Sequence, residues 1–295
     1  MRTVGFIGVG NIGNPMAMCL VKAGIGVIVC DKRRSALQGF EAMEVPTTAK
    51  PSGCSGCDIV IVMVADDGQV EEVLLGAADG LLNSVDPEHP PLLAIMSTVM
   101  PDTIKNLSSP CEQKNVRLID APVSGGPIVA AEGKLAIMVG GEEQDLNEMR
   151  PVLEVMGATI YHAGPLGNGT ITKLVNNILG ISAFFVASEA FDLARQLGMD
   201  PHALCAIFEN STARNFLTRD WESGRKIFAS FSENLDACKV AVNLSRKDLH
   251  HALNLSAKAG IRSTFLENIV QGINHMSYEE INEKWKSLAT WDKAV

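Results

Sequence analysis

The stretch GFIGVGNIGNPMAMCLVKAG, residues 5–24, decides the fold. It overlaps the apolar run 4–7, which predicts a buried strand. Apolar side chains then recur at helical spacing over residues 12–23, which predicts a helix, and Gly24 is typical of the position just beyond a helix C-terminus. A Gly-x-Gly-x-x-Gly motif lies between them, so we expect the strand–turn–helix start of a βαβ unit that binds a dinucleotide.

Each glycine of the motif has a physical reason to be there. Gly8 permits the tight turn, Gly10 lets the backbone approach a pyrophosphate, and Gly13 lets helix and strand pack closely. Asn11 and Ile12 complete the turn, and the helix N-terminus that follows offers unpaired N–H groups to phosphates. We therefore expect all five residues to bind the cofactor, with a purely structural glycine turn as the alternative.

Asp31 ends the next predicted strand, residues 26–30. A carboxylate at this position can accept hydrogen bonds from ribose hydroxyls and repels a 2′-phosphate, which favours NAD. The basic triplet 32–34 follows directly, and a cation there could pair with such a phosphate, or the triplet could be a solvated turn. We expect NAD, with NADP as the alternative.

The first half of the chain alternates short apolar runs with helical patterns, which is typical of βαβ units and a parallel sheet. Further strands are predicted at residues 58–64, 92–96, 117–120 and 135–139. An open α/β sheet places its ligands at the carboxyl ends of its strands. We therefore expect the residues at two such ends to contact the cofactor: Val64, Ala65, Ser97 and Thr98. The alternative is that the hydroxyls of Ser97 and Thr98 only cap the backbone.

After about residue 165 the pattern changes. Residues 168–197 are interrupted only by Gly180 and predict an unusually long, apolar helix. Downstream, residues 201–210, 235–258 and 264–288 also predict helix. We expect an α/β fold class with a Rossmann-type parallel sheet over residues 1–165, a long interdomain helix, and an all-α domain over residues 166–295.

Composition limits the class of function. The 295 residues include 46% hydrophobic and 20% charged residues, an ordinary mix for two globular domains. The net charge of −9 argues against nucleic-acid binding. No apolar stretch is expected to reach the length of about 18 residues that a membrane helix needs, and the start is too short before the first motif for a secretory signal. Seven scattered cysteines, including the lone pair Cys54 and Cys57, predict reduced thiols, no metal site and a cytoplasmic location.

Three further stretches follow the opening motif: DAPVSGG at 120–126, GNGTITKLVNN at 167–177 and RKDL at 246–249. Together the four stretches resemble the signatures of the β-hydroxyacid dehydrogenases, a family that includes 3-hydroxyisobutyrate dehydrogenase and tartronate semialdehyde reductase and is related to 6-phosphogluconate dehydrogenase. The resemblance covers nearly the whole chain. At Ile12 many members carry methionine, a departure that we expect to affect packing more than chemistry.

The resemblance implies a substrate site at Ser124, Gly125 and Gly126. The residues themselves agree, because a hydroxyl and several backbone N–H groups without large side chains form a concavity that suits a carboxylate. A turn without a ligand is the alternative.

The resemblance also implies that Lys173 is catalytic. Hydride addition to a carbonyl builds negative charge on oxygen, so an ammonium group can donate a proton, and in oxidation the lysine would act as base if its surroundings lower its pKa. Asn177 lies one turn later on the same helix face and would orient the substrate hydroxyl, as could Asn176. Lys247 would lie near cofactor or substrate, with a surface ion pair to Asp248 as the alternative.

We therefore expect an NAD(P)-dependent oxidoreductase that acts on a small carboxylate substrate, a short β-hydroxyacid or its semialdehyde. The alternatives are oxidative decarboxylation, imine reduction, or a non-catalytic dinucleotide-binding sensor. Lys173 argues against imine reduction, because imine reductases of this fold generally replace that lysine. The long apolar helix, through which family members commonly pair, predicts a homodimer or homotetramer.

Overall fold

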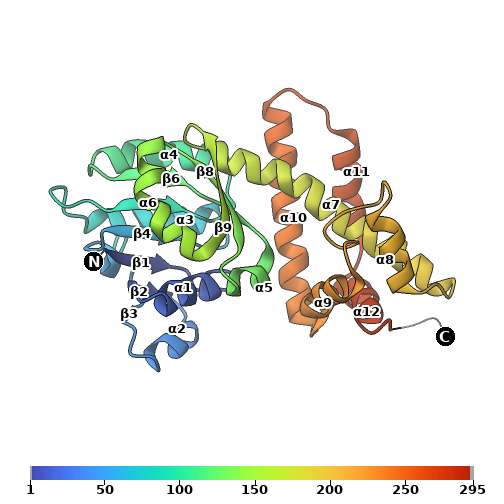
Figure 1. Ribbon diagram of the computed structural model, residues 1–295. Helices are drawn as coiled ribbons and strands as arrows, with labels where there is room; N and C mark the ends of the chain where they lie inside the picture. Colours follow the sequence, from blue (N-terminus) through green and yellow to red (C-terminus); the bar gives the residue numbers. More distant parts are fainter. Residues whose placement is uncertain (1, 293–295) are drawn as a thin grey trace. The chain divides into compact units, whose positions relative to one another are not determined.

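The computed structural model describes residues 2–292 and divides the chain into two compact units, Met1–Lys173 and Leu174–Val295 (Figure 1). The helix α7, Asn168–Gln196, begins in the first unit and continues in the second. The domain boundary that the sequence suggests between residues 165 and 166 stays a prediction.

In the described part of the first unit, nine strands form one sheet in the order β3-β2-β1-β4-β5-β6-β8-β7, with β9 paired to β8. Their bounds are β1 Thr3–Ile7, β2 Gly26–Cys30, β3 Thr47–Thr48, β4 Ile59–Val62, β5 Leu92–Ile95, β6 Arg117–Asp120, β7 Val123–Ser124, β8 Leu135–Gly140 and β9 Gly157–Gly164. All pairings from β3 to β6 are parallel, as predicted. At the far edge, β8 runs antiparallel to β6 and β7, so the sheet is mostly parallel.

Helices cover both faces of this sheet. Their bounds are α1 Gly13–Lys22, α2 Arg34–Glu41, α3 Asp67–Leu75, α4 Pro101–Glu112, α5 Gly126–Ala131 and α6 Glu143–Met156, with 3-10 turns η1 Pro51–Cys54 and η2 Leu81–Asn83. Strand β4 shows why its sequence IVIV is apolar throughout: Ile59 and Ile61 belong to the core under α1, α2, α5 and α6, whereas Val60 and Val62 belong to the core under α3 and α4. A strand buried on both faces has no polar alternation.

The second unit is all helical in its described residues. After α7 come α8 Pro201–Glu209, α9 Trp221–Ser232, α10 Leu235–Lys258, α11 Thr264–His275 and α12 Tyr278–Ala289. An aromatic core holds them together, with the ring of Phe184 5.0 Å from that of Trp285 and the ring of Phe191 5.1 Å from that of Trp221.

Two helix predictions need correction. The helix expected over residues 264–288 is two helices, because Ser277 caps α12 in a reciprocal box with Glu280. The expectation that no stretch reaches membrane-spanning length is also wrong, since α7 is long enough and contains an 18-residue window with a mean hydropathy of 1.5. The core helices of soluble proteins pass the same test.

Candidate active site

The glycine turn after β1 has the geometry that its sequence predicts. Gly8 has a φ of +96°, and a Cβ there would collide with the carbonyl oxygen of Met63. A Cβ on Gly13 would collide with the carbonyl oxygen of Gly8. At Gly10, by contrast, the nearest described atom to an added Cβ is 3.8 Å away, on Arg33. Two of the glycines are therefore required by packing, and the third leaves the backbone open to a ligand.

A hollow of about 400 Å³ lies in front of this turn. Its walls include Val9, Gly10 and Asn11 on one side and Arg33 and Ser35 on the other. Within residues 2–292, the N-terminus of α1 receives no capping hydrogen bond from its N-cap side chain, at Ile12. In the first turn, the Asn14 N–H donates to the Gly10 carbonyl oxygen at 2.9 Å and Pro15 has no N–H, so the N–H of Gly13 is the group that remains for a phosphate.

Asp31 lies beside the hollow and is held by its neighbours. Its carboxylate accepts hydrogen bonds from the Val9 N–H at 3.1 Å and the Arg33 N–H at 2.9 Å, and the guanidinium of Arg33 adds two more, each at 3.1 Å. Burial opposes ionisation of Asp31, but the hydrogen bonds from Arg33 and Val9 outweigh it and hold its pKa below the usual value. The carboxylate is therefore ionised and forms an ion pair with Arg33, which lines the hollow.

The predicted residues at the strand ends have different environments. Ser97 is fully buried, and its hydroxyl accepts a hydrogen bond from the Val64 N–H at 2.8 Å, which joins the ends of β5 and β4. Val64 packs against the glycine turn, because a Cβ on Gly8 would lie 2.9 Å from its Cγ1. Ala65 is exposed and Thr98 half-buried. A cofactor contact by each of the four residues stays a prediction.

The turn after β7 depends on two glycines. Gly125 has a φ of +145° and Gly126 a φ of +76°. A Cβ on Gly125 would lie 2.8 Å from Val129, whereas no described atom lies within 4 Å of a Cβ added to Gly126. Ser124 is half-buried at the end of β7, and of the two residues that follow it, Gly126 leaves its backbone open to a ligand.

Asp120 has a role that the sequence analysis missed. Fully buried at the end of β6, its carboxylate accepts the N–H of Gly167 at 2.7 Å and the N–H of Thr170 at 2.6 Å. Burial raises the pKa of Asp120, which the hydrogen bonds from Gly167 and Thr170 only partly offset. Asp120 thus fixes the first turn of α7, the helix that carries Lys173.

Close backbone packing holds the same turn of α7 against the sheet. A Cβ on Gly169 would collide with the carbonyl oxygen of Met138, and a Cβ on Gly140 would lie 2.7 Å from the Gly169 nitrogen. Lys173 follows one turn later and is buried, with 8% of its surface exposed. The first unit therefore positions this lysine through rigid backbone contacts.

In the second unit, the structure joins two motifs that the sequence analysis treated separately. The Asn177 amide, one turn beyond Lys173 on α7, donates a hydrogen bond to Asp248 on α10 at 2.7 Å. The ammonium of Lys247 lies 3.2 Å from the other oxygen of Asp248, and the amide of Asn176 donates to the Asn177 oxygen at 3.2 Å. Asp248 therefore fixes the orientation of the Asn177 amide.

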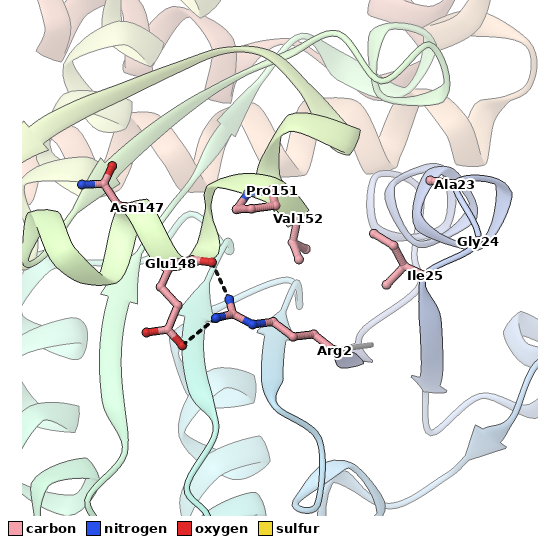
Figure 2. Close-up of a pocket in the computed structure, with 8 residues that line it drawn as sticks. All are labelled: Arg2, Ala23, Gly24, Ile25, Asn147, Glu148, Pro151 and Val152. Carbon is pink, nitrogen blue, oxygen red and sulfur yellow. Dashed lines mark hydrogen bonds and ion pairs between the residues drawn. The ribbon is translucent and has the colours of Figure 1, made fainter.

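A second hollow, of about 370 Å³, lies at the opposite end of the strands (Figure 2). It is bordered by Arg2 before β1, by Ile25 before β2 and by Glu148 on α6. Arg2 donates a hydrogen bond to the Glu148 carbonyl oxygen at 2.7 Å. Ligands of such sheets bind at the carboxyl ends of the strands, so we do not consider this hollow a candidate active site.

Two family models match almost the whole chain. Residues 3–164 match the model described as the NAD binding domain of 6-phosphogluconate dehydrogenase. Residues 167–286 match the model described as the NAD-binding domain of NADP-dependent 3-hydroxyisobutyrate dehydrogenase.

Similar curated proteins carry related names. A probable mitochondrial 3-hydroxyisobutyrate dehydrogenase of Dictyostelium discoideum is 37% identical over 215 residues, which are 72% of this chain and 66% of that protein. The 3-hydroxyisobutyrate dehydrogenase of Pseudomonas aeruginosa is 37% identical over 217 residues, 73% of this chain and 72% of that one. The NAD-dependent L-serine dehydrogenase of the same organism is 35% identical with the same coverage. The alignments thus span about two thirds of these relatives' lengths.

Solved structures share the fold over the full chain. A Mycobacterium tuberculosis 3-hydroxyisobutyrate dehydrogenase with L-serine has a TM-score of 0.79 at 28% identity, covering 98% of this chain and 99% of that one. An imine reductase from Myxococcus stipitatus has a TM-score of 0.61 at 18% identity, covering 99% of this chain and 97% of that one, and this likeness concerns the fold alone.

Proposed function

Because this chain belongs to the β-hydroxyacid dehydrogenase family, we propose that it transfers hydride between a nicotinamide dinucleotide and a short β-hydroxyacid or its semialdehyde. The observation that carries the proposal is the buried Lys173, held by a helix whose first turn is fixed to the end of the sheet by Asp120. The alternative, a glycine turn with a purely structural role, would not explain why Lys173 is buried and held in place.

The first unit supplies the cofactor site. The open backbone at Gly10 and the uncapped start of α1 fit a pyrophosphate, and Asp31 with Arg33 faces the ribose end of the hollow. When bound, NAD or NADP supplies or accepts the hydride. We keep NAD as the expected cofactor, although the ion pair with Arg33 weakens the repulsion that Asp31 alone would exert on a 2′-phosphate.

The substrate carboxylate binds at Ser124, Gly125 and Gly126, with Asn176 as a further contact. Lys173 donates a proton to the carbonyl oxygen during reduction and removes one from the hydroxyl during oxidation. Asn177, held by Asp248, orients that hydroxyl. The names of the relatives, which cite 3-hydroxyisobutyrate and L-serine, support an acid with a three-carbon backbone that carries its hydroxyl on the β-carbon.

The test follows absorbance of the reduced cofactor with 3-hydroxyisobutyrate, L-serine, glycerate, threonate, sulfolactate and 3-hydroxypropionate, each with NAD and with NADP. We expect turnover with at least one acid and a loss of about 10²–10⁴-fold in kcat for Lys173→Ala, the range of general acid–base catalysis. Lys226→Ala, which removes an exposed lysine of α9, is the control and keeps full activity. Full activity in Lys173→Ala would refute the assigned role.

We further propose that the chain forms a homodimer or homotetramer through α7. Leu179, Val186 and Leu193 are 72%, 59% and 63% exposed, and their spacing of seven residues places them on one face of the helix. Such a continuous apolar strip is typical of an interface between subunits. The cytoplasmic location and the absence of nucleic-acid partners stay predictions from composition. The absence of a membrane partner also stays a prediction, but the length of α7 removes the argument from apolar stretches.

A further inference from the structure

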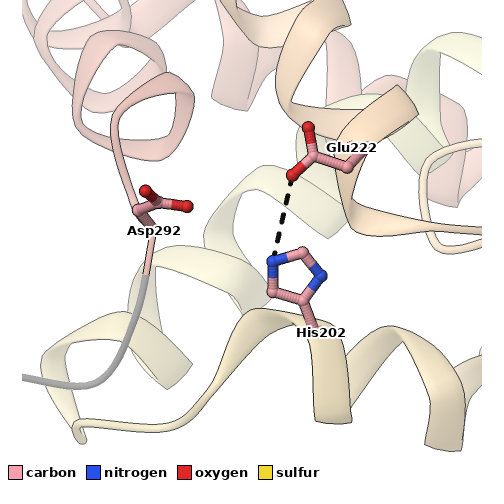
Figure 3. A group of neighbouring side chains, drawn as sticks. All are labelled: His202, Glu222 and Asp292. Atoms are coloured by element: carbon pink, nitrogen blue, oxygen red, sulfur yellow. Dashed lines mark ion pairs between the residues drawn. The ribbon is translucent and has the colours of Figure 1, made fainter.

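Three metal-ligating side chains converge on the surface of the second unit. His202 lies in the first turn of α8, Glu222 in the first turn of α9, and Asp292 just after α12. Their ligand atoms all lie within 4.8 Å of one another, and the His202 Nε2 is 3.9 Å from the Glu222 Oε1. Figure 3 shows the imidazole and the two carboxylates facing a common gap.

The backbone beneath this cluster is fixed by buried neighbours. Trp221 and Trp291, each adjacent to one of the carboxylates, are 1% and 6% exposed. The Trp221 indole N–H donates to the Trp291 carbonyl oxygen at 3.0 Å, and the two rings are 5.1 Å apart. His202 follows the buried Pro201. Three distant parts of the chain therefore hold the ligand side chains at fixed starting points, although the side chains themselves are exposed.

The charges favour a divalent cation. Arg225 holds one oxygen of Glu222 by two hydrogen bonds of 3.0 and 2.9 Å, which leaves the other oxygen toward His202. Beside the imidazole, two carboxylates and one guanidinium together carry a charge of −1. Imidazole with carboxylates suits Zn²⁺ and other first-row transition metals better than Mg²⁺ or Ca²⁺.

The spacing fits the same ions. Ligand atoms bound to zinc at about 2.0–2.2 Å cannot lie more than about 4.4 Å apart. The distance of 3.9 Å between His202 and Glu222 meets this limit, whereas the whole cluster spans up to 4.8 Å, so metal binding requires the exposed side chains to move closer together.

We propose that His202, Glu222 and Asp292 form a binding site for a divalent first-row transition-metal ion, completed by water. Bound metal joins the starts of α8 and α9 to the segment after α12. The sequence predicted no metal site because residues so far apart carry no ligand-spacing motif.

Calorimetric titration of the full chain with Zn²⁺ tests the proposal. We expect one ion per chain, and at least tenfold weaker binding in both His202→Ala and Asp292→Asn. The matched control is His89→Ala, another exposed histidine, which lies 3.3 Å from Asp86 as a two-residue pair and should leave binding unchanged.

Titration with Co²⁺ separates this site from binding by the seven cysteines. We expect a visible d–d spectrum without the near-ultraviolet charge-transfer band of thiolate ligation, and its loss in His202→Ala. Absence of a bound ion, equal affinity in the three variants, or a thiolate band that persists in His202→Ala would each overturn the proposal.

Discussion

We expect Arg33 to affect the preference between NAD and NADP through its ion pair with Asp31. Its guanidinium already holds both carboxylate oxygens of Asp31. In Arg33→Ala an uncompensated negative charge would face a 2′-phosphate, so we expect the ratio of kcat/KM for NAD to that for NADP to rise about tenfold, equivalent to about 1.4 kcal/mol. Arg34→Ala, on the next exposed residue, should leave the ratio unchanged. A ratio that stays constant or falls in Arg33→Ala would contradict this role.

The same carboxylate predicts a pH dependence of stability. Since the pKa of Asp31 is lower in the folded state than its unfolded value of about 3.9, the ionised form stabilises the fold above about pH 4, and this stabilisation is lost as pH falls through the folded-state pKa. The difference in free energy of unfolding between the native chain and Asp31→Asn should therefore shrink on acidification. Denaturant titrations at several pH values measure it, with the exposed Asp79→Asn as a control.

At this scale the sequence predicts the glycines and Asp31 from local spacing and Lys173 from the family resemblance, and their contacts with cofactor and substrate stay predictions. The sequence analysis missed Asp120 as the partner of the α7 backbone and Asp248 as the partner of Asn177. Asp120 and Asp248 act through contacts with residues 47 and 71 positions away, respectively, and such pairings appear only once the fold brings the segments together. The structure also shows that Ser97 uses its hydroxyl to join two strands, which residue type alone does not indicate.

At the scale of elements, the start of α7 depends on Asp120. In Asp120→Asn the amide has one acceptor oxygen for two N–H donors, so one buried N–H loses its partner and the fold loses about 1–3 kcal/mol. We expect kcat to fall as well, because the turn that carries Lys173 loosens, while KM for the cofactor changes little. Urea unfolding and steady-state kinetics test both parts, and unchanged stability would exclude the capping role.

Strand and helix predictions succeeded where hydrophobic periodicity was strong. They failed where strand pairing set the direction of a strand or where a cap set the start of a helix. Strands β2 and β6 match the predicted bounds because turn residues flank apolar runs. The antiparallel pairing of β8 and the existence of β9 depend on long-range contacts. The break between α11 and α12 was visible in principle, because Ser277 and Glu280 form the sequence signature of a capping box.

At the scale of the whole molecule, the exposed strip of α7 predicts assembly. Val186→Lys places a charge at its centre, so we expect light scattering to show a shift from a multimer toward the single-chain mass of 31.6 kDa. The control Leu75→Lys changes another exposed apolar residue, on α3, and should not alter the mass. A native chain that is monomeric, or that sediments with lipid vesicles, would contradict assembly through α7.

The 29-residue helix α7 has an evolutionary consequence. One turn takes 3.6 residues, so inserting or deleting a single residue between Lys173 and Asn177 would rotate Asn177 by about 100° away from the helix face that it shares with Lys173. Homologous genes should therefore tolerate almost no length change between Lys173 and Asn177. We expect the length of this part of the helix to be conserved among homologues, even where its individual side chains vary.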